Sequence, residues 1–127
     1  MDPTAPSAGT TPAWLNRLFA SIDAKDADRF VQFLAGDAAF HFGNLPPAMG
    51  RDAIRALVGN FFAAIRSLRH ELAEAWVLPG HAISHGTVTY TRHDGSELAV
   101  PFATVFTLDG ELIRDYRIFS DASQLFS

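Results

Sequence analysis

One carboxylate is a candidate for chemistry because it follows an aromatic strand near the end of the chain. The segment YRIFSDASQLF places Asp121 two residues after Phe119. In an apolar, poorly hydrated site the ionised form of such a carboxylate is disfavoured, so its pKa rises toward the range that suits general acid or base catalysis. A neighbouring guanidinium, from Arg117 or Arg92, would lower that pKa again. We therefore take Asp121 as the candidate catalytic residue.

Asp121 also has structural interpretations. The sequence Asp-Ala-Ser-Gln fits a capping box, in which Asp121 caps a short final turn and Gln124 reaches back to it. An ion pair with Arg117 is a further alternative. At the level of sequence all three roles stay open.

The histidines do not form a metal motif, although the chain has five of them. His81 and His85 are four residues apart, but Pro79-Gly80 and the alternation that follows put them in a turn and a strand rather than on one helical face. The absence of Cys excludes thiolate catalysis and thiolate ligands, and we expect neither a metal nor another cofactor. His70 fits better as a polar pocket residue or proton carrier, or as a structurally satisfied strand histidine.

Composition excludes two classes of partner. The net charge is −4 and the chain has a single Lys, Lys25, whereas nucleic-acid binding needs clustered cations. No apolar run reaches the roughly 20 residues of a membrane span. We expect a cytoplasmic protein that binds neither nucleic acid nor membrane. Its 127 residues, 48% of them hydrophobic, fit one domain with one core.

The pattern of elements predicts helices followed by a β meander. Residues 1–12 are small, polar and Pro-rich and are expected to be a disordered tail, so the domain covers 13–127. Thr11 is the expected cap of a first helix, Asp26 of a second that stops at Gly36, and a third runs over 54–65. A strand is expected at 38–42. Turns at Pro79-Gly80, Asp94-Gly95 and Asp109-Gly110 separate four further strands, predicted at Leu68–Leu78, Ala82–Arg92, Leu98–Leu108 and Leu112–Ser120.

The last two predicted strands suggest an interface. VPFATVFTL and LIRDYRIF carry apolar residues at both parities, so neither face of that part of the sheet is patterned for water. The predicted helices can cover only one face. We therefore expect a homodimer through the outer face of the sheet; the alternative is a sheet bent so strongly that it covers itself.

The order of elements, together with three phrases, resembles the nuclear-transport-factor-2-like superfamily, in particular its SnoaL-like branch. The phrases are FASIDAKDADRFVQFLAGDAAFHFGN, GRDAIRALVGNFF and LDGELIRDYRIFSD. The resemblance spans about residues 13 to 126 and implies an α+β fold, in which a cone-shaped, curved, mostly antiparallel sheet wraps around N-terminal helices. In that superfamily a cavity lies between the helices and the concave face of the sheet.

Better-defined branches of the superfamily narrow the chemistry that the resemblance implies. Ketosteroid-isomerase-like sequences use an Asp on the first strand, and the corresponding residue here is Phe42, so that base is absent. Limonene-epoxide-hydrolase-like sequences pair an aromatic residue with Asn, and another with Asp; Phe42 with Asn44, and Phe119 with Asp121, look similar. Those sequences also carry an Arg–Asp pair on a middle strand, and here only the Arg has a counterpart, Arg92.

Alternation along the strands, applied to that cavity, gives the candidate pocket. Its residues are Phe40, Phe42, Asn44, His70, Trp76, Tyr90, Arg92, Phe102, Arg117 and Phe119. The resemblance implies a cofactor-independent isomerase, cyclase, epoxide hydrolase or dehydratase that acts on a small apolar oxygenated ligand with Asp121 as acid or base. The alternative is a non-catalytic ligand-binding or dimerisation module of the same fold.

Overall fold

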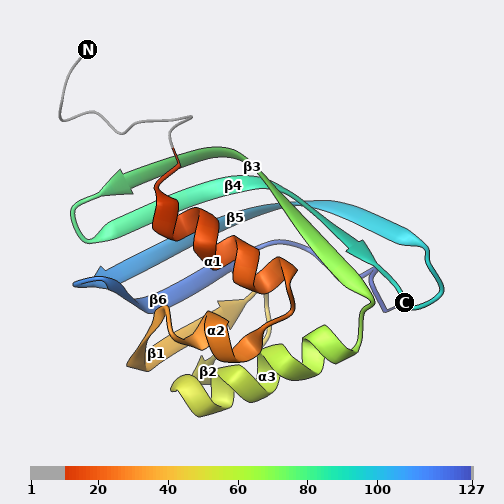
Figure 1. The fold of residues 1–127 in the computed structure, drawn as a ribbon, viewed down its shortest axis with the longest axis horizontal. Helices are drawn as coiled ribbons and strands as arrows, with labels where there is room; N and C mark the ends of the chain where they lie inside the picture. Colours follow the sequence, from red (N-terminus) through yellow and green to blue (C-terminus); the bar gives the residue numbers. More distant parts are fainter. Residues whose placement is uncertain (1–10, 127) are drawn as a thin grey trace.

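The computed structural model describes residues 11–126, in which three helices pack on one six-stranded sheet (Figure 1). The helices are α1 (Ala13–Asp23), α2 (Ala27–Val31) and α3 (Arg51–Ala63). The strands are β1 (Leu34–Phe42), β2 (Ala48–Met49), β3 (Ser67–Leu78), β4 (His81–Thr91), β5 (Glu97–Asp109) and β6 (Leu112–Phe119). The α+β architecture is confirmed. The predicted tail at 1–12 lies outside the described residues except for Thr11 and Pro12.

Local signals set the starts of the helices. Pro12, rather than Thr11, caps α1, with φ −64° and ψ 149°. The side chain of Asp26 caps α2 as predicted and accepts a hydrogen bond from the backbone N–H of Arg29 at 3.0 Å. On the two longer helices the buried residues recur every three or four positions, so one face of each packs inward. They include Leu15, Leu18, Phe19 and Ile22 on α1 and Ile54, Val58 and Phe62 on α3.

The sheet has the strand order β2-β1-β6-β5-β4-β3. Strands β3 to β6 form the predicted antiparallel meander, and β1 joins it by parallel pairing with β6. Two details differ from the sequence prediction. β1 begins at Leu34, which pairs with Ile113, so Gly36 lies within a strand instead of ending a helix. β2, with two residues, was not predicted at all and pairs with the outer edge of β1.

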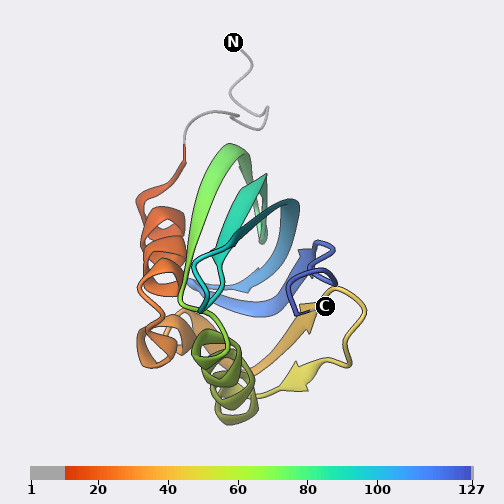
Figure 2. The same cartoon turned by 90° about the vertical axis from the view of Figure 1, so that its right-hand side faces the viewer.

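The sheet curls, and all three described helices lie on its concave side (Figures 1 and 2). Figure 2 shows α1 and α3 facing the hollow of the curved strands, while no described helix covers the convex face. This is the cone that the family resemblance implied. The concave side is therefore the place where the core and any enclosed site must lie.

Two irregularities in the strands decide which side chains face inward. The β3–β4 register shifts between Leu72 and Glu74, opposite Gly86, where a Cβ would overlap the carbonyl oxygen of Glu71. A second shift lies in β6, where Ile113 and Tyr116 are both buried although they are three residues apart. Each bulge moves the following residues to the opposite face from the one that simple alternation assigns.

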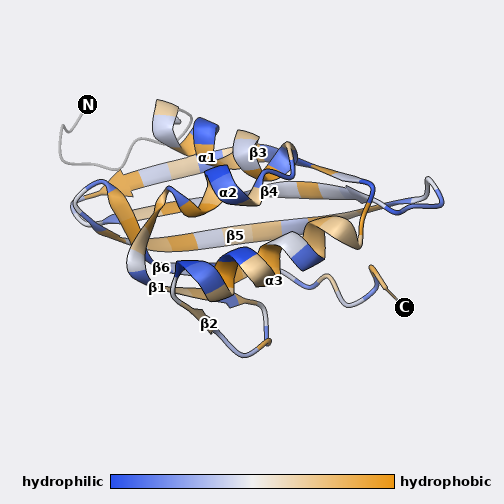
Figure 3. Ribbon diagram, turned by 60° about the horizontal axis from the view of Figure 1, so that its bottom comes forward, coloured by the Kyte–Doolittle hydropathy of each residue, from blue (hydrophilic) through white to orange (hydrophobic). Residues whose placement is uncertain are grey.

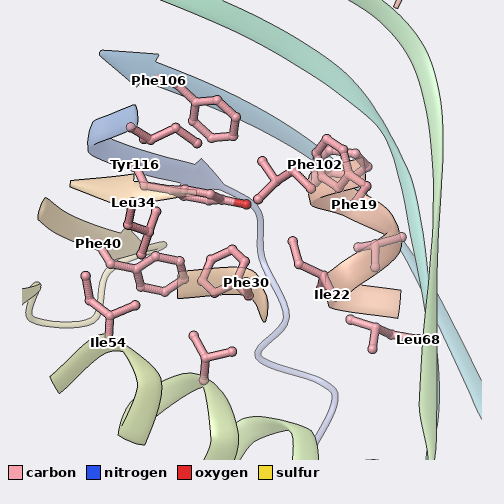
Figure 4. Close-up of a cluster of buried hydrophobic side chains, with 14 of the residues drawn as sticks. Phe19, Ile22, Phe30, Leu34, Phe40, Ile54, Leu68, Phe102, Phe106 and Tyr116 are labelled. Atoms are coloured by element: carbon pink, nitrogen blue, oxygen red, sulfur yellow. The ribbon is translucent and has the colours of Figure 1, made fainter. Parts of the chain in front are cut away.

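The core fills the space between helices and sheet. Figure 3 shows hydrophilic residues along the outer sides of the helices, and Figure 4 shows aromatic and aliphatic side chains converging from both layers. Phe30 of α2 contacts Phe40 and Tyr116 with ring centroids 6.0 and 5.6 Å apart, and Phe106 lies 4.3 Å from Tyr116. These contacts close the end of the cone that β1, β6 and α2 share.

Candidate active site

A cavity of about 890 Å³ lies between the helices and the concave face of the sheet. Side chains of α1, α2 and α3, of β1 and β3 to β6, and of the C-terminal segment line it. Most of them are aliphatic or aromatic, the usual make-up of a small-molecule site with a few polar groups. The apolar lining includes Phe19, Ile22, Phe30, Val58, Phe61, Phe62 and Leu68.

His70, on β3, brings an imidazole to the cavity and is held by a carboxylate from α1. Its Nδ1 lies 2.6 Å from Oδ1 of Asp23, and its backbone N–H donates to Oδ2 of Asp23 at 3.0 Å. The side chain of His70 is 12% exposed and lines the cavity. Because a carboxylate can only accept, Nδ1 carries the hydrogen and the lone pair lies on Nε2. That arrangement prepares Nε2 to take a proton from a bound molecule.

The aromatic neighbours of His70 fix its ring in a dry environment. The imidazole lies 4.9 Å from the ring of Phe19 and 5.1 Å, edge to face, from that of Phe102. Phe19 and Phe102 are both buried. Among residues 11–126 no hydrogen bond to Nε2 is found. The ring nitrogen that remains is therefore available to a ligand.

Two tyrosines bring hydroxyl groups to the same cavity. Tyr90, on β4, and Tyr116, on β6, line it, and both are buried. Burial raises the pKa of Tyr90 to about 12 and raises the pKa of Tyr116 well above its ordinary value. Both phenols therefore stay protonated near neutral pH and can donate hydrogen bonds.

Comparison with known proteins identifies the family. Residues 15–116 match the SnoaL-like domain. The chain belongs to the SnoaL-like family. A search of curated proteins gives no significant match. The domain match confirms the SnoaL-like resemblance that the sequence predicted.

Solved structures share the fold at low sequence identity. A hypothetical protein from Catenulispora acidiphila with a ketosteroid isomerase-like fold, in complex with trimethylamine, is 19% identical, with 90% of this chain and 89% of that chain covered and a TM-score of 0.82. TerC, co-crystallised with polyporic acid, is 13% identical, with 88% and 92% covered and a TM-score of 0.76. A limonene-epoxide-hydrolase-like epoxide hydrolase from M. tuberculosis is 12% identical, with 88% and 83% covered and a TM-score of 0.74.

Asp121 lies at the mouth of the cavity in this SnoaL-like domain, one residue beyond Ser120 and outside β6. Its side chain is exposed, and its Oδ1 accepts a hydrogen bond from the backbone N–H of Ser123 at 3.0 Å. Hydrogen bonds from the side chain and the backbone of Ser123 lower the pKa of Asp121. The carboxylate thus closes a short turn, and its hydrogen bonds, rather than burial or a neighbouring guanidinium, set the direction of its pKa shift.

Three predicted pocket residues do not line the cavity. Trp76 follows the bulge of β3 and lies on the convex face, where its ring stacks on that of His85. Arg117 is also on the convex face, because it pairs with Val105, and its Nε donates to Oδ2 of Asp115 at 2.6 Å. Arg92 lies past the end of β4, and its guanidinium donates to the backbone carbonyls of residues 124 and 125. Arg92 therefore holds the C-terminal segment and does not line the cavity.

The remaining predicted residues do line the cavity. Phe40, Phe42, Asn44, His70, Tyr90, Phe102 and Phe119 are all part of its wall. Asn44 and Phe119 are exposed and lie at the mouth with Asp121. The wall also contains Tyr116, which alternation from Asp121 had assigned to the other face.

Sequence reasoning missed Asp23 as a functional residue. It lies 47 positions from His70 and is the last residue of α1. A signal was present, because Asp23 follows the buried Ile22 on the inward face of the helix. An acidic side chain at that place needs a partner from the sheet.

The described residues give no sign of a metal centre or a membrane helix. Within 11–126 no group of three or more His, Cys, Asp or Glu side chains is arranged to hold a metal ion. No described helix has the length and apolar character needed to cross a bilayer.

Proposed function

We propose that this SnoaL-like chain is a cofactor-independent acid/base enzyme that removes and returns a proton on a small apolar, oxygen-bearing molecule. The observation that carries the proposal is the Asp23–His70 pair, with a contact of 2.6 Å, at the wall of an apolar cavity of about 890 Å³. Nε2 of His70 is the base, and Asp23 stabilises the imidazolium that forms.

The geometry suits proton transfer at carbon. A C–H next to a carbonyl would give its proton to Nε2, and the electron pair would move onto the carbonyl oxygen as an enolate. Return of the proton to another carbon gives an isomerisation. Loss of a leaving group from the β-carbon, with the proton passed from the imidazolium to that group, gives an elimination. Both are reactions of the isomerase and lyase classes, and neither needs a group that the chain does not supply.

Solved relatives support a small-molecule ligand. One was crystallised with trimethylamine and another with polyporic acid. The apolar lining of the cavity favours a largely hydrophobic molecule here. The alternative is a ligand-binding module. It would bind the same kind of molecule in the same cavity but would not convert it.

Deuterium exchange of a simple ketone tests the proposal. The wild-type protein, incubated with 1-tetralone in D2O, should accelerate the loss of the C2 proton signals in the NMR spectrum above the buffer rate. The His70→Gln variant should remove most of that acceleration. A wild-type protein that binds the ketone without accelerating exchange would favour the ligand-binding alternative.

The same assay tests Asp121, whose acid/base role stays a prediction and is the second candidate because its side chain also lines the cavity. A lowered pKa and an exposed position make it a weak base, so Asp121→Asn should keep the exchange rate within about threefold. Asn still offers Oδ1 to the Ser123 N–H, so the melting temperature should change little. A fall of 100-fold or more would assign the chemistry to Asp121.

We also propose that the chain is a homodimer through the convex face of the sheet. No described helix covers that face, and Pro101, Ala103 and Val105 of β5 point to it because the alternate residues Phe102, Thr104 and Phe106 are buried on the other side. Arg117 and Asp115 make the β6 part of this face charged, and β4 contributes His85, Thr87 and Thr89. The apolar part of the convex face is therefore β5, with Ile83 of β4 opposite Val105.

Sedimentation tests the dimer. Val105→Lys places a positive charge on the proposed interface of both copies and should shift the protein to monomer, with the dissociation constant raised at least about tenfold. Glu111→Gln, in the β5–β6 turn, changes the net charge by the same +1 and should leave the assembly unchanged. A wild-type protein that is monomeric at 100 µM would refute this interface.

A further inference from the structure

Most of the exposed large hydrophobic side chains in residues 11–126 lie at the mouth of the cavity. Six such side chains are exposed in that part of the chain, and four of them line the cavity: Leu45, Leu57, Phe119 and Phe126. Their exposed fractions are 57%, 36%, 56% and 62%. We call these four residues the apolar rim. Single exposed hydrophobic residues are ordinary, but a group of them around an opening indicates a surface that something covers.

Part of the rim continues directly into the cavity wall. Phe61 lies one turn after Leu57 on α3, so the two side chains are neighbours on the helix surface. The ring centroid of Phe61 is 6.2 Å from that of Phe126 and 5.9 Å from that of Phe42, which also lines the cavity. The carbonyl of Phe42 accepts the backbone N–H of Leu45 at 3.0 Å. An apolar molecule can therefore extend from the cavity onto the rim and keep apolar contacts along its length.

The fold holds the ring of Phe126 at this opening. The backbone carbonyls of residues 124 and 125 accept hydrogen bonds from Arg92 at 3.1 and 3.0 Å, and the side chain of Leu125 is buried. The adjacent Phe126 is thereby kept at the mouth, where its ring contacts water. Exposure of a phenyl ring to water is unfavourable, so a molecule that covers it gains binding free energy.

The size of the cavity indicates a ligand that is larger than a simple bicyclic ketone. A volume of about 890 Å³ is near the upper end of the roughly 300–1,000 Å³ that ligand pockets span. Most of the wall is aliphatic or aromatic, so most of the ligand that fills it must be apolar. A ligand that fills this cavity and also covers the rim is long.

The charges at the mouth distinguish the possible occupants of the rim. No Lys or Arg is among the described residues that line the cavity, and the one acidic side chain among them, Asp121, is exposed at the mouth. A phospholipid surface would bring its phosphates to that carboxylate with no cation to pair with them. A protein partner would have to cover Asn44, Asp121 and Ser123 among the rim residues, whereas the centre of an interface is depleted of charge. The apolar tail of the ligand meets neither objection.

We propose that the ligand is a long, largely apolar molecule whose tail leaves the cavity and covers the apolar rim, while its oxygen-bearing end lies inside beside His70. The place of the oxygen-bearing end rests on the proposed function, but the contact of the tail with the rim is a property of binding alone. Each methylene group that the rim removes from water tightens binding by up to about fourfold. The rim therefore selects ligands by the length of the tail.

Straight-chain methyl ketones of increasing length test this proposal. In titrations of the wild-type protein followed by NMR, affinity should rise at each step from 2-pentanone to 2-tridecanone, because the longer chains reach the rim. Leu57→Gln and Phe126→Gln make the rim polar. Each variant should bind 2-tridecanone at least about fivefold more weakly than the wild type, and 2-pentanone within about twofold of it. Phe119 is left unchanged, because its pairing with Ala103 places it beside the face proposed for the dimer.

Val77→Gln is the matched control, because Val77 is 44% exposed and does not line the cavity. It should bind 2-pentanone and 2-tridecanone as the wild type does. His70→Gln should lose proton exchange and keep the dependence on chain length, so failure of the proposed function and failure of this inference give different results.

Three results of the titrations would overturn the inference. They are a wild-type affinity that stops rising at short chains, rim variants that bind 2-tridecanone as tightly as the wild type, and an equal loss in Val77→Gln. Sedimentation with phosphatidylcholine vesicles checks the other occupant, and the wild-type protein should stay in the supernatant. Co-sedimentation that Phe126→Gln abolishes would assign the rim to a bilayer instead.

Discussion

Replacing His70 by Gln should lower the rate of enzyme-catalysed proton exchange by about 10²–10⁴-fold, the range that general-base groups contribute. Gln has a similar length and keeps a polar head at the cavity wall, but its amide is not basic. The backbone N–H of residue 70 still donates to Asp23 in the variant. The fold should therefore survive, and circular dichroism with a thermal melt will check that the loss is chemical.

Asp23 acts through His70 and should show a different kinetic pattern. Its carboxylate holds Nδ1 at 2.6 Å and also accepts the backbone N–H of residue 70. In Asp23→Asn an amide NH2 can face Nδ1, which favours the tautomer that has its hydrogen on Nε2. We expect kcat to fall by at least about tenfold while KM changes little, because the substrate does not touch Asp23.

His85 offers a matched control for the His70→Gln variant. Its Nε2 lies 3.3 Å from Oε1 of Glu74, so it too is a histidine beside a carboxylate, but it stands on the convex face. His85→Gln should leave exchange unchanged. Equal losses in His70→Gln and His85→Gln would mean that the effect is not one of catalysis at the cavity, and the proposed base would be abandoned.

The sequence carried enough information for the fold but not for the full pairing of strands. Apolar residues at helical spacing predicted α1 and α3, and Gly in three turns predicted the meander. The parallel pairing of β1 with β6 joins residues about 75 positions apart, as in His41 opposite Arg117. Such a contact leaves no local trace in a sequence, because it is set by how the layers pack rather than by any turn.

The candidate site shows where alternation fails. Counting in twos placed Trp76 inside with His70, but the extra residue in β3 reverses the face between them. On β6 the count started from Asp121, which lies beyond the end of the strand, and it therefore set Arg117 inside and Tyr116 outside. Bulges are single-residue features whose signal is weak; here the only hint on β3 is Gly86 in the partner strand. His70 was found because it precedes the bulge, whereas its partner Asp23 depends on the packing of α1 on β3.

Gly86→Ala should reduce the free energy of unfolding by about 3 kcal/mol, at the upper end of what overpacking causes. A Cβ at this position would overlap the carbonyl oxygen of Glu71 and lie 3.0 Å from the backbone N of Ala73. These are backbone atoms of the bulge, so no flexible side chain can move aside. Urea unfolding measures the loss, and the exchange assay should report a second effect, because β3 must shift next to His70.

Gly59→Ala makes the same chemical change where there is room for it. Gly59 lies within α3, and a Cβ there would meet no atom within 4 Å. Alanine lowers the entropy of the unfolded chain and favours a helix, so this variant should be more stable by about 0.5–1 kcal/mol. If the free energy of unfolding falls in Gly86→Ala and rises in Gly59→Ala, the loss at position 86 comes from the clash with the bulge and not from replacing a glycine. If Gly86→Ala proves as stable as the wild-type protein, the bulge can move, and the strand that carries His70 is not held in one register by Gly86.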